Sequence, residues 1–233
     1  MNTMETQERL VAQGLATKSV NGHLATYKYA RKVMFENLWT PELIECRGHT
    51  YDSRNGNIVT LPFPKFFAYG ENGNWDGVPL DTPVWAYKKI NGYMAAAAMY
   101  EGELVVSTTG STKSDYAGWA KELIKGTYIP EGETVLFEVC IPQDPHIVPE
   151  NYGAHLLALR CKRELYFALP SSLFTLAEAL EFCRVYKYEG LMLQKEDGSI
   201  CKLKSDYYIG KKLLMRRKHI PDILPGMWGE KGS

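Results

Sequence analysis

The amino-acid sequence predicts an α+β fold in which antiparallel sheets are flanked by helices. Short apolar or alternating runs, separated by turn residues, occupy most of the stretch from Leu43 to Thr109, which is typical of antiparallel strands. Helical periodicity is confined to the first forty residues, to Ser114–Lys125 and to two later segments. A chain of 233 residues is long enough to bury a sizeable core.

The N-terminal half is predicted to change from helix to sheet near Pro41. Apolar residues recur every three to four positions in Glu5–Leu15 and His23–Trp39, which favours helices there. Asn91-Gly92 and Glu101-Gly102-Glu103 favour hairpin turns between neighbouring strands. The strands expected in this half are Leu43–Tyr51, Ile58–Leu61, Val84–Ile90, Tyr93–Tyr100 and Leu104–Thr109.

The C-terminal half continues the mixed pattern. Thr175 and Glu178 have the spacing of a capping box, which predicts a helix that runs to about Val185. Asp197-Gly198 favours a hairpin turn. The other elements expected are a helix over Ser114–Lys125, strands over Thr134–Ile141, Leu156–Arg160, Leu191–Gln194 and Ser199–Lys204, and a last helix over Asp206–Lys218.

Composition narrows the class of protein without selecting a partner. Lys+Arg and Asp+Glu are both 27, so the formal net charge is zero, whereas a protein that coats nucleic acid is usually basic. A basic cleft can still be balanced by acidic residues elsewhere. The five cysteines lack C-x-x-C spacing, so we expect reduced thiols in a cytoplasmic compartment. No membrane span or secretory segment is expected.

Lys89 heads the motif Lys89-Ile-Asn91-Gly92, which fits two interpretations. By itself the motif favours a hairpin turn with a solvated lysine. The alternative is a nucleophilic amine at a nucleotide pocket. Such an amine must lose its proton, and lowering a lysine pKa from about 10.4 to near 7 requires about 4 kcal/mol. Because neighbouring cations and burial supply that free energy, this alternative predicts further cations around Lys89.

Charged residues elsewhere have spacings that could meet this requirement. Lys202 and Lys204 are two apart on a predicted strand, so they share one face, although an exposed face is the ordinary explanation. Glu138 lies inside an apolar strand, where an unpartnered carboxylate is rare. Glu189 precedes the apolar run from Leu191 and could bind Mg²⁺, or could simply lie in a surface turn.

Three upstream cations lie in settings that suit phosphate contact. Arg47 interrupts an apolar strand, Lys65 precedes Phe66-Phe67, and Lys113 lies in Gly110-Ser-Thr-Lys113-Ser114 before a helix. Each has an ordinary alternative as well. The Lys65 stem could cover the phenylalanine pair, and the loop of Lys113 could be a plain helix cap.

The order of these motifs resembles that of the covalent nucleotidyltransferase superfamily, which contains DNA ligases, RNA ligases and mRNA-capping guanylyltransferases. Within it, the upstream motifs resemble the single-strand RNA ligases of T-even bacteriophages. The resemblance covers about Leu43 to Tyr208. It implies a ligase adenylation fold, of the ATP-grasp-like kind, with a nucleotide pocket between the sheets. One departure is Asn91, where the phage ligases usually have Asp.

The resemblance also implies roles for individual residues. Lys89 would form a lysyl–AMP intermediate, and Asn91 and Gly92 would lie at the nucleotide, Gly92 letting the backbone approach it. The other implied roles are phosphate contact by Arg47, Lys65 and Lys113, ribose binding by Glu138, Mg²⁺ (or Mn²⁺) binding by Glu189 and Glu138, charge neutralisation by Lys202 and Lys204, and support of that pair by Tyr208.

We therefore expect an ATP-dependent RNA ligase that joins a 5′-phosphate end to a 3′-hydroxyl end of RNA. It would act as a cytoplasmic monomer, in the host-cell cytoplasm if phage-encoded. The expected division is a helical segment over 1–40 packed on the catalytic domain, a nucleotidyltransferase domain over 41–220 and a flexible tail over 221–233, without a C-terminal accessory domain. The alternatives are a DNA ligase or guanylyltransferase of the same superfamily, or a non-catalytic module that binds RNA ends.

Overall fold

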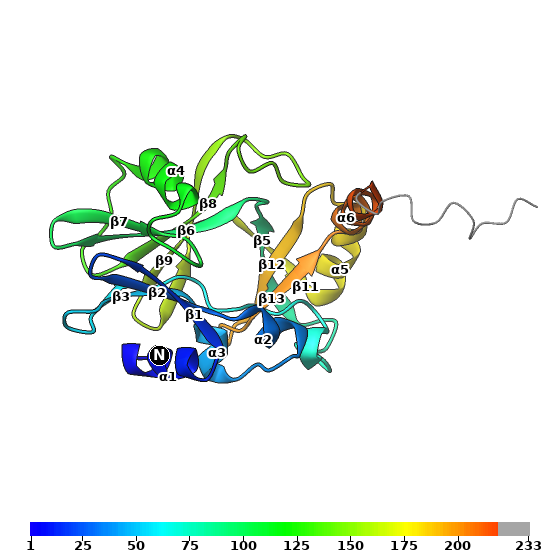
Figure 1. Ribbon diagram of the computed structural model, residues 1–233. Helices are drawn as coiled ribbons and strands as arrows, with labels where there is room; N and C mark the ends of the chain where they lie inside the picture. The colour runs from blue at the N-terminus through cyan, green and yellow to red at the C-terminus, as the bar shows by residue number, and fades with distance from the viewer. Residues whose placement is uncertain (219–233) are drawn as a thin grey trace, which may run out of the picture.

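Three antiparallel sheets, flanked by helices, form the framework of the molecule (Figure 1). The structure is a computed structural model, and it describes residues 1–218. The predicted α+β class with antiparallel sheets is confirmed. The tail predicted over 221–233 lies outside the described residues.

The N-terminal sheet has the strand order β1-β2-β3-β4. Thr40 caps the helix before β3, because its side chain accepts a hydrogen bond from the Leu43 amide at 3.3 Å. The strands and helices of this region are α1 (Met4–Ala12), β1 (Ala16–Asn21), β2 (Leu24–Tyr29), α2 (Arg31–Phe35), α3 (Pro41–Glu45), β3 (Arg47–Asp52) and β4 (Ile58–Thr60).

The predictions for the first fifty residues are partly wrong. The segment expected to be one helix over His23–Trp39 contains the strand β2 and only the short helix α2, and β1 is absent from the prediction. Most of β1 is exposed on both faces, so it has none of the alternation that identifies a strand with one buried face. The dipeptide Asn21-Gly22, which favours hairpins, was the signal available in the sequence.

The five-stranded sheet has the order β10-β9-β8-β6-β7. The helix α4 (Asp115–Ile124) packs on it, and Ala120 and Ile124 join Phe137 and Val139 in one buried cluster. This arrangement buries one face of the sheet. The strands are β6 (Tyr93–Tyr100), β7 (Glu103–Ser107), β8 (Thr134–Cys140), β9 (Gly153–Cys161) and β10 (Glu164–Phe167).

The third sheet, called here the β5 sheet, has the order β11-β5-β12-β13. Leu176 and Ala179 of its helix α5 are buried against Val84 and Leu193. Its elements are η1 (Glu71–Gly73), β5 (Pro83–Lys89), β11 (Ser171–Thr175), α5 (Leu176–Val185), β12 (Gly190–Gln194), β13 (Ile200–Lys204) and α6 (Asp206–Lys218).

The hairpin predicted at Asn91-Gly92 is wrong. β5 pairs with β11 and β12, whereas β6 pairs with β7 and β8, so Asn91 and Gly92 cross from one sheet to another. The other two predicted hairpins, β6–β7 and β12–β13, are confirmed. The crossing matters because it places the end of β5 where all three sheets meet.

Polar and apolar contacts join the sheets. Thr60 of the N-terminal sheet and Ser107 of the five-stranded sheet share a buried hydrogen bond of 2.7 Å. Arg54 bridges Asp52 and Glu101 with ion pairs of 2.7 and 2.8 Å. Within residues 1–218, no helix has the length and apolar character needed to cross a membrane.

Candidate active site

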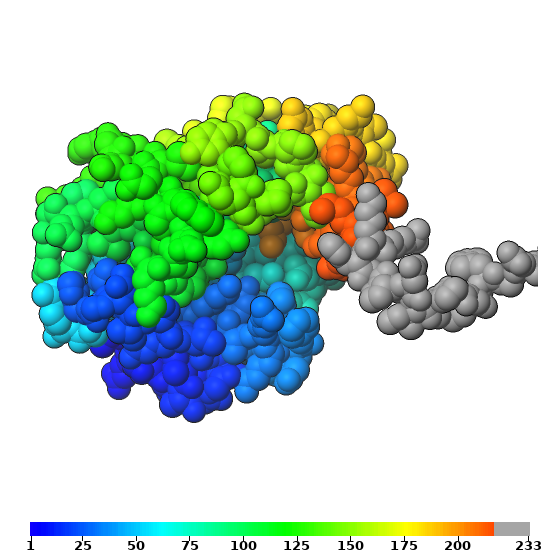
Figure 2. All heavy atoms as spheres, turned by 45° about the horizontal axis from the view of Figure 1, so that its top comes forward, coloured from blue at the N-terminus to red at the C-terminus, as the bar shows by residue number. Residues whose placement is uncertain are grey.

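A cavity of about 330 Å³ lies where the three sheets meet. In the space-filling view, the surface is hollowed between the blue N-terminal part and the green part, with an orange segment at depth (Figure 2). The β5 sheet contributes Lys89 and Lys202, the N-terminal sheet contributes Arg47, and the five-stranded sheet contributes Glu138. The expected pocket between sheets is therefore present.

The register of the β5 sheet aligns lysines of two strands, β5 and β13, on either side of β12. Lys89 of β5 and Lys204 of β13 both pair with Gly190 of β12, so they flank a position that has no side chain. Lys202 pairs with Met192 in the next row on the same face. Residues more than one hundred positions apart in the chain thus present their side chains toward one space.

Glu189 is the carboxylate in contact with Lys89. Its Oε1 lies 2.8 Å from Lys89 Nζ, and its side chain is 6 % exposed. Its Oε2 accepts a hydrogen bond of 3.0 Å from Asn91 Nδ2. Asn91 Oδ1 in turn accepts a bond of 2.9 Å from the Val148 amide. Asn91 therefore does not line the cavity itself but links Glu189 to the loop that contains Val148.

Glu138 forms part of the cavity wall beside Gly92. The Gly92 amide donates to Glu138 Oε1 at 3.0 Å. Burial raises the pKa of Glu138, and the charge of Lys89 opposes that rise. A Cβ on residue 92 would lie 2.4 Å from the Val139 carbonyl oxygen, so only glycine fits. Close contact with β8 thus explains Gly92, and approach to a nucleotide stays a prediction.

The cations predicted to surround Lys89 are present. Burial, together with the charges of Lys65, Lys89 and Arg47, lowers the pKa of Lys202 to about 7. Burial also lowers the pKa of Lys65, whose Nζ lies 5.5 Å from the Trp39 ring centroid. Lys65 Nζ also lies 5.4 Å from the Phe67 ring centroid, and Lys65 is part of the cavity lining. Its contact with a phosphate stays a prediction.

Besides Asn91 and Glu189, three more predicted residues lie outside the cavity lining. Lys204 Nζ is 5.5 Å from the Tyr208 ring centroid, and the Tyr208 amide donates to Ser205 Oγ at 3.1 Å, which fixes the start of α6. Lys113 is exposed on the loop before α4. Residues 1–218 contain no cluster of three His, Cys, Asp or Glu side chains that could hold a metal ion.

Sequence reasoning missed Glu150 and the apolar walls. Glu150 is 6 % exposed and forms an ion pair of 2.7 Å with Lys88, beside Lys89. Phe167 stacks on Tyr87 at 4.5 Å between centroids and helps to line the cavity. Glu150 follows Pro149 in a segment without periodicity, so no pattern distinguished it from a loop residue. Phe167 lies on the short strand β10, which was not predicted.

The fold defines the class of protein. An archaeal ATP-dependent RNA ligase superimposes with a TM-score of 0.61 at 13 % identity, covering 91 % of this chain and 64 % of that one. A protein of Aquifex aeolicus, described as an ATP-dependent DNA ligase, gives a TM-score of 0.57 at 13 % identity, with 88 % and 63 % covered. The chain therefore has the nucleotidyltransferase fold of ATP-dependent ligases.

Sequence similarity selects the family within that class. The RNA ligase family model matches residues 45–196. RNA ligase 1 of Bacteriophage TS2126 is 31 % identical over 182 residues, which cover 69 % of this chain and 45 % of that protein. The chain belongs to the RNA ligase family. It spans about half the length of the curated relatives that it matches.

Proposed function

We propose that this chain is the catalytic part of an ATP-dependent RNA ligase with Lys89 as its nucleophile. The observation that carries the proposal is the position of Lys89 at the meeting point of three sheets. Further cations line the same cavity, among them Arg47, Lys65 and Lys202. A triphosphate bound there would have its charge neutralised by side chains already in place.

In the first step, the lone pair of Lys89 Nζ attacks the α-phosphorus of ATP. An N–P bond forms, the bond from the α-phosphorus to the bridging oxygen breaks, and pyrophosphate leaves with that electron pair while Nζ releases its proton to solvent. Lys202 and Lys204 lie on the same sheet face as Lys89, so we assign them to the charge that develops on the phosphates. Glu138 is assigned to the ribose hydroxyls.

In the second step, an oxygen of an RNA 5′-phosphate attacks the α-phosphorus, the N–P bond breaks, and Lys89 leaves as the amine after Nζ takes up a proton from solvent. AMP is then joined to the RNA end by a pyrophosphate linkage. In the third step, a 3′-hydroxyl attacks the phosphorus of the RNA 5′-phosphate and displaces AMP, which completes the phosphodiester. All three steps place charge on phosphate oxygens, so one cationic cavity can serve each of them.

Mg²⁺, or Mn²⁺ in its place, belongs to the proposal as well. Such ions are held by one or two carboxylates together with substrate phosphates and waters, so a cluster of three protein ligands is not required. Glu138 fits this need because only one of its two carboxylate oxygens is in use. Its Oε1 accepts a hydrogen bond from the Gly92 amide, and its Oε2 accepts none from residues 1–218. Glu189 fits once Lys89 has moved, because Lys89 and Asn91 occupy its two oxygens. The bound ion would withdraw charge from the phosphates.

The remaining parts of the proposal concern the setting. The substrate is RNA with 5′-phosphate and 3′-hydroxyl ends, and the protein acts as a monomer in the cytoplasm. Family membership supports the choice of RNA. The likeness to a DNA ligase at 13 % identity concerns the fold alone, so acceptance of DNA is an outcome that the experiment must report.

The test separates nucleotide donor from strand acceptor. The protein is incubated with Mg²⁺ and α-labelled ATP, GTP or NAD in turn, and the labelled protein is isolated and chased with 5′-phosphorylated RNA or DNA. We expect covalent label from ATP and its transfer to RNA. Lys89→Ala and the charge-preserving Lys89→Arg should take no label, because neither has an amine that can attack.

Lys187→Ala is the matched control, since Lys187 is an exposed lysine just before Glu189. It should label like the wild type. Label retained by Lys89→Ala would show that another residue is the nucleophile and would overturn the proposal. Transfer to DNA in preference to RNA would overturn the assignment of the substrate but not that of the nucleophile.

A further inference from the structure

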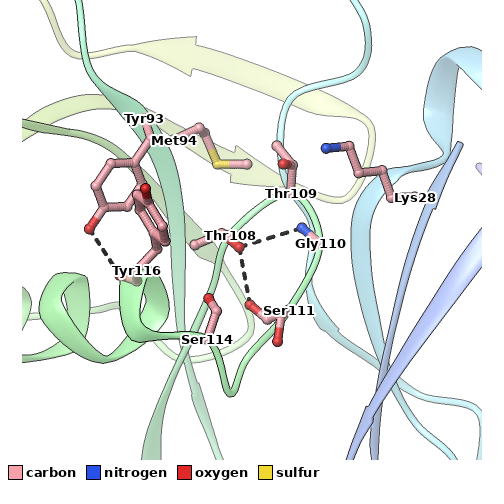
Figure 3. A pocket seen from close by; sticks show the side chains of 9 residues that line it. All are labelled: Lys28, Tyr93, Met94, Thr108, Thr109, Gly110, Ser111, Ser114 and Tyr116. Atoms are coloured by element: carbon pink, nitrogen blue, oxygen red, sulfur yellow. Dashed lines mark hydrogen bonds between the residues drawn. The ribbon is translucent and has the colours of Figure 1, made fainter. Parts of the chain in front are cut away.

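A second cavity, of about 420 Å³, lies beside the first and shares Tyr93, Met94 and Thr109 with it. Figure 3 shows Lys28 of β2 directing its ammonium group toward Thr109, across from the loop that carries Gly110 and Ser111. Six of the nine residues that line this cavity carry a hydroxyl group, namely Tyr93, Thr108, Thr109, Ser111, Ser114 and Tyr116. Hydroxyls and a cation together suit a phosphate ester.

Lys28 has an unusual partner in its own sheet. In the pairing of β2 with β3, it lies directly opposite Arg47. Like charges placed opposite each other on neighbouring strands destabilise a sheet. Among residues 1–218, neither side chain forms an ion pair with a carboxylate, and the charges that act on Lys28 are those of Arg47 and Arg31. A cationic pair of this kind, unbalanced within the described chain, is a binding feature for an anion.

A β-bulge shapes this part of the cavity. The pairing shifts between Tyr27 and Lys28, because Gly48 is an additional residue on β3. Gly48 has φ +100°, and a Cβ there would lie 2.8 Å from Thr109 Cα. The glycine therefore lets the loop at Thr109 pack directly on β3. The bulge and the loop together bring Lys28 and the hydroxyl groups to one surface.

An aromatic ring stands at the other side of the same cavity. Tyr116 is 40 % exposed, and its ring is held edge-on by Tyr93 at 5.1 Å and by Trp119 at 5.3 Å between centroids. Proteins that bind single strands combine cations along the backbone with exposed aromatic rings on which bases stack. Inorganic phosphate has no base to stack on this ring, so the ring favours a nucleic-acid strand as the ligand.

We propose that Lys28, Tyr116 and the loop Thr108–Ser111 form a subsite for the single-stranded end of an RNA substrate. Lys28 contacts a phosphate of the strand, hydroxyls of the loop donate hydrogen bonds to its oxygens, and a base stacks on Tyr116. This inference rests on the proposed function and specifies where its second substrate lies. The shared wall of Tyr93, Met94 and Thr109 brings that strand next to the nucleotide on Lys89.

The experiment measures the two half-reactions separately in Lys28→Met and Tyr116→Leu. The first is labelling of the protein by ATP, and the second is transfer of AMP from isolated labelled protein to a 5′-phosphorylated single-stranded RNA. We expect labelling to stay within about twofold of wild type and the KM for RNA to rise about tenfold, as for one lost charge-assisted contact. For Lys28→Met, the slope of log KM against log salt should fall by about 0.7.

Matched controls are Lys121→Met on α4 and Tyr128→Leu, both of exposed residues outside the cavity, and they should change neither half-reaction. Lys28→Arg keeps the charge and should keep the transfer reaction and the salt slope, which a purely structural role would not require. Equal losses in both half-reactions would assign the phosphate to ATP and overturn the strand subsite. Unchanged transfer in both variants would overturn it as well.

A separate binding measurement tests the subsite even if the proposed function is wrong. If the wild type takes no AMP, binding of a fluorescent 5′-phosphorylated RNA to the wild type and to Lys28→Met still measures the subsite. A loss of affinity in Lys28→Met alone would then keep the subsite while the nucleotidyl transfer is abandoned. Equal affinities would overturn it.

Discussion

The N-terminal sheet and the β5 sheet meet at the same cavity, yet they are built in opposite ways. The strands of the N-terminal sheet follow one another within residues 16–60, whereas those of the β5 sheet come from segments between residues 83 and 204. The sheet assembled from distant segments supplies Lys89, Lys202 and Lys204. Long-range assembly thus places these lysines, and the local sheet forms the other side of the cavity.

The basic side chains of the two sheets also differ in their partners. In the β5 sheet, Lys89 is paired with Glu189 at 2.8 Å. In the N-terminal sheet, Lys28 and Arg47 face each other without a carboxylate partner among residues 1–218. In the two proposals made above, this difference separates the site of covalent chemistry from a surface that binds an anion. Three predictions test this difference between the two sheets.

The largest expected effect is on stability, and it lies in the N-terminal sheet. Burial lowers the pKa of His49 to about 3, so below pH 6.5 the unfolded chain binds a proton that the folded chain does not. Folding therefore loses stability as pH falls from about 6.5 toward 3, by about 2 kcal/mol at pH 5. In His49→Gln this slope should be absent, as measured by urea unfolding at pH 7 and pH 5.

His23→Gln is the matched control, because His23 lies in the β1–β2 turn of the same sheet and is half-buried, outside the core. It should keep the wild-type slope. Labelling by ATP at pH 7.5 should be the same in His49→Gln as in wild type. An unchanged slope in His49→Gln would mean that His49 does not control the acid stability of this sheet.

The next effect concerns the β5 sheet and the binding of ATP. Lys202 has a pKa of about 7 without ligand, and a bound triphosphate favours its charged form. Affinity should therefore be full below pH 7 and weaken above it, by about tenfold between pH 7 and pH 8.5. The measurement is calorimetry in Lys89→Arg, which keeps the charge but cannot form the covalent bond.

Lys202→Arg in the same background provides the comparison. Arginine stays charged over this range, so the pH dependence should disappear while affinity at pH 7 is kept. A wild-type slope in Lys202→Arg would assign the titration to another group. It would also remove the reason for placing Lys202 at the phosphates.

The smallest effect is expected at Asn91, which follows β5. In Asn91→Asp the acceptor for the Val148 amide remains, but the donor to Glu189 is replaced by a second carboxylate. We expect a loss of about 1 kcal/mol in the free energy of unfolding, together with slower labelling by ATP. Asn151→Asp, at an exposed position, is the control and should change neither quantity. Equal stability of the wild type and Asn91→Asp would show that the bond to Glu189 contributes nothing.

The parts of the fold that sequence could predict are those where one face of a strand is buried. β12 and β13 alternate or run apolar, and their hairpin was predicted, as was the helix capped by Thr175. β1 has no buried face to reveal it. The hairpin expected at Asn91-Gly92 failed for another reason, because a turn dipeptide cannot report which strands pair across the molecule.

The site was predictable to the extent that residue type and spacing carry chemistry. Spacing placed Lys202 and Lys204 on one face, and the structure brings Lys202 and Lys89 to one cavity. Glu150 and Lys28 gave no such signal. Each was singled out by its neighbour in the folded chain. Glu150 pairs with Lys88, which is distant in sequence, and Lys28 lies opposite Arg47 on another strand.

Gly190, between Lys89 and Lys204, has a consequence for protein engineering. A Cβ there would lie 2.0 Å from the Leu203 carbonyl oxygen, so every other amino acid is excluded by backbone rather than by a movable side chain. Variants at this position, made to accept a different nucleotide donor, would therefore not fold correctly around residue 190. The apolar walls formed by Phe63, Leu157 and Phe167 offer the better place for diversification, since their volumes can be exchanged against one another while the phosphate end of the cavity is left intact.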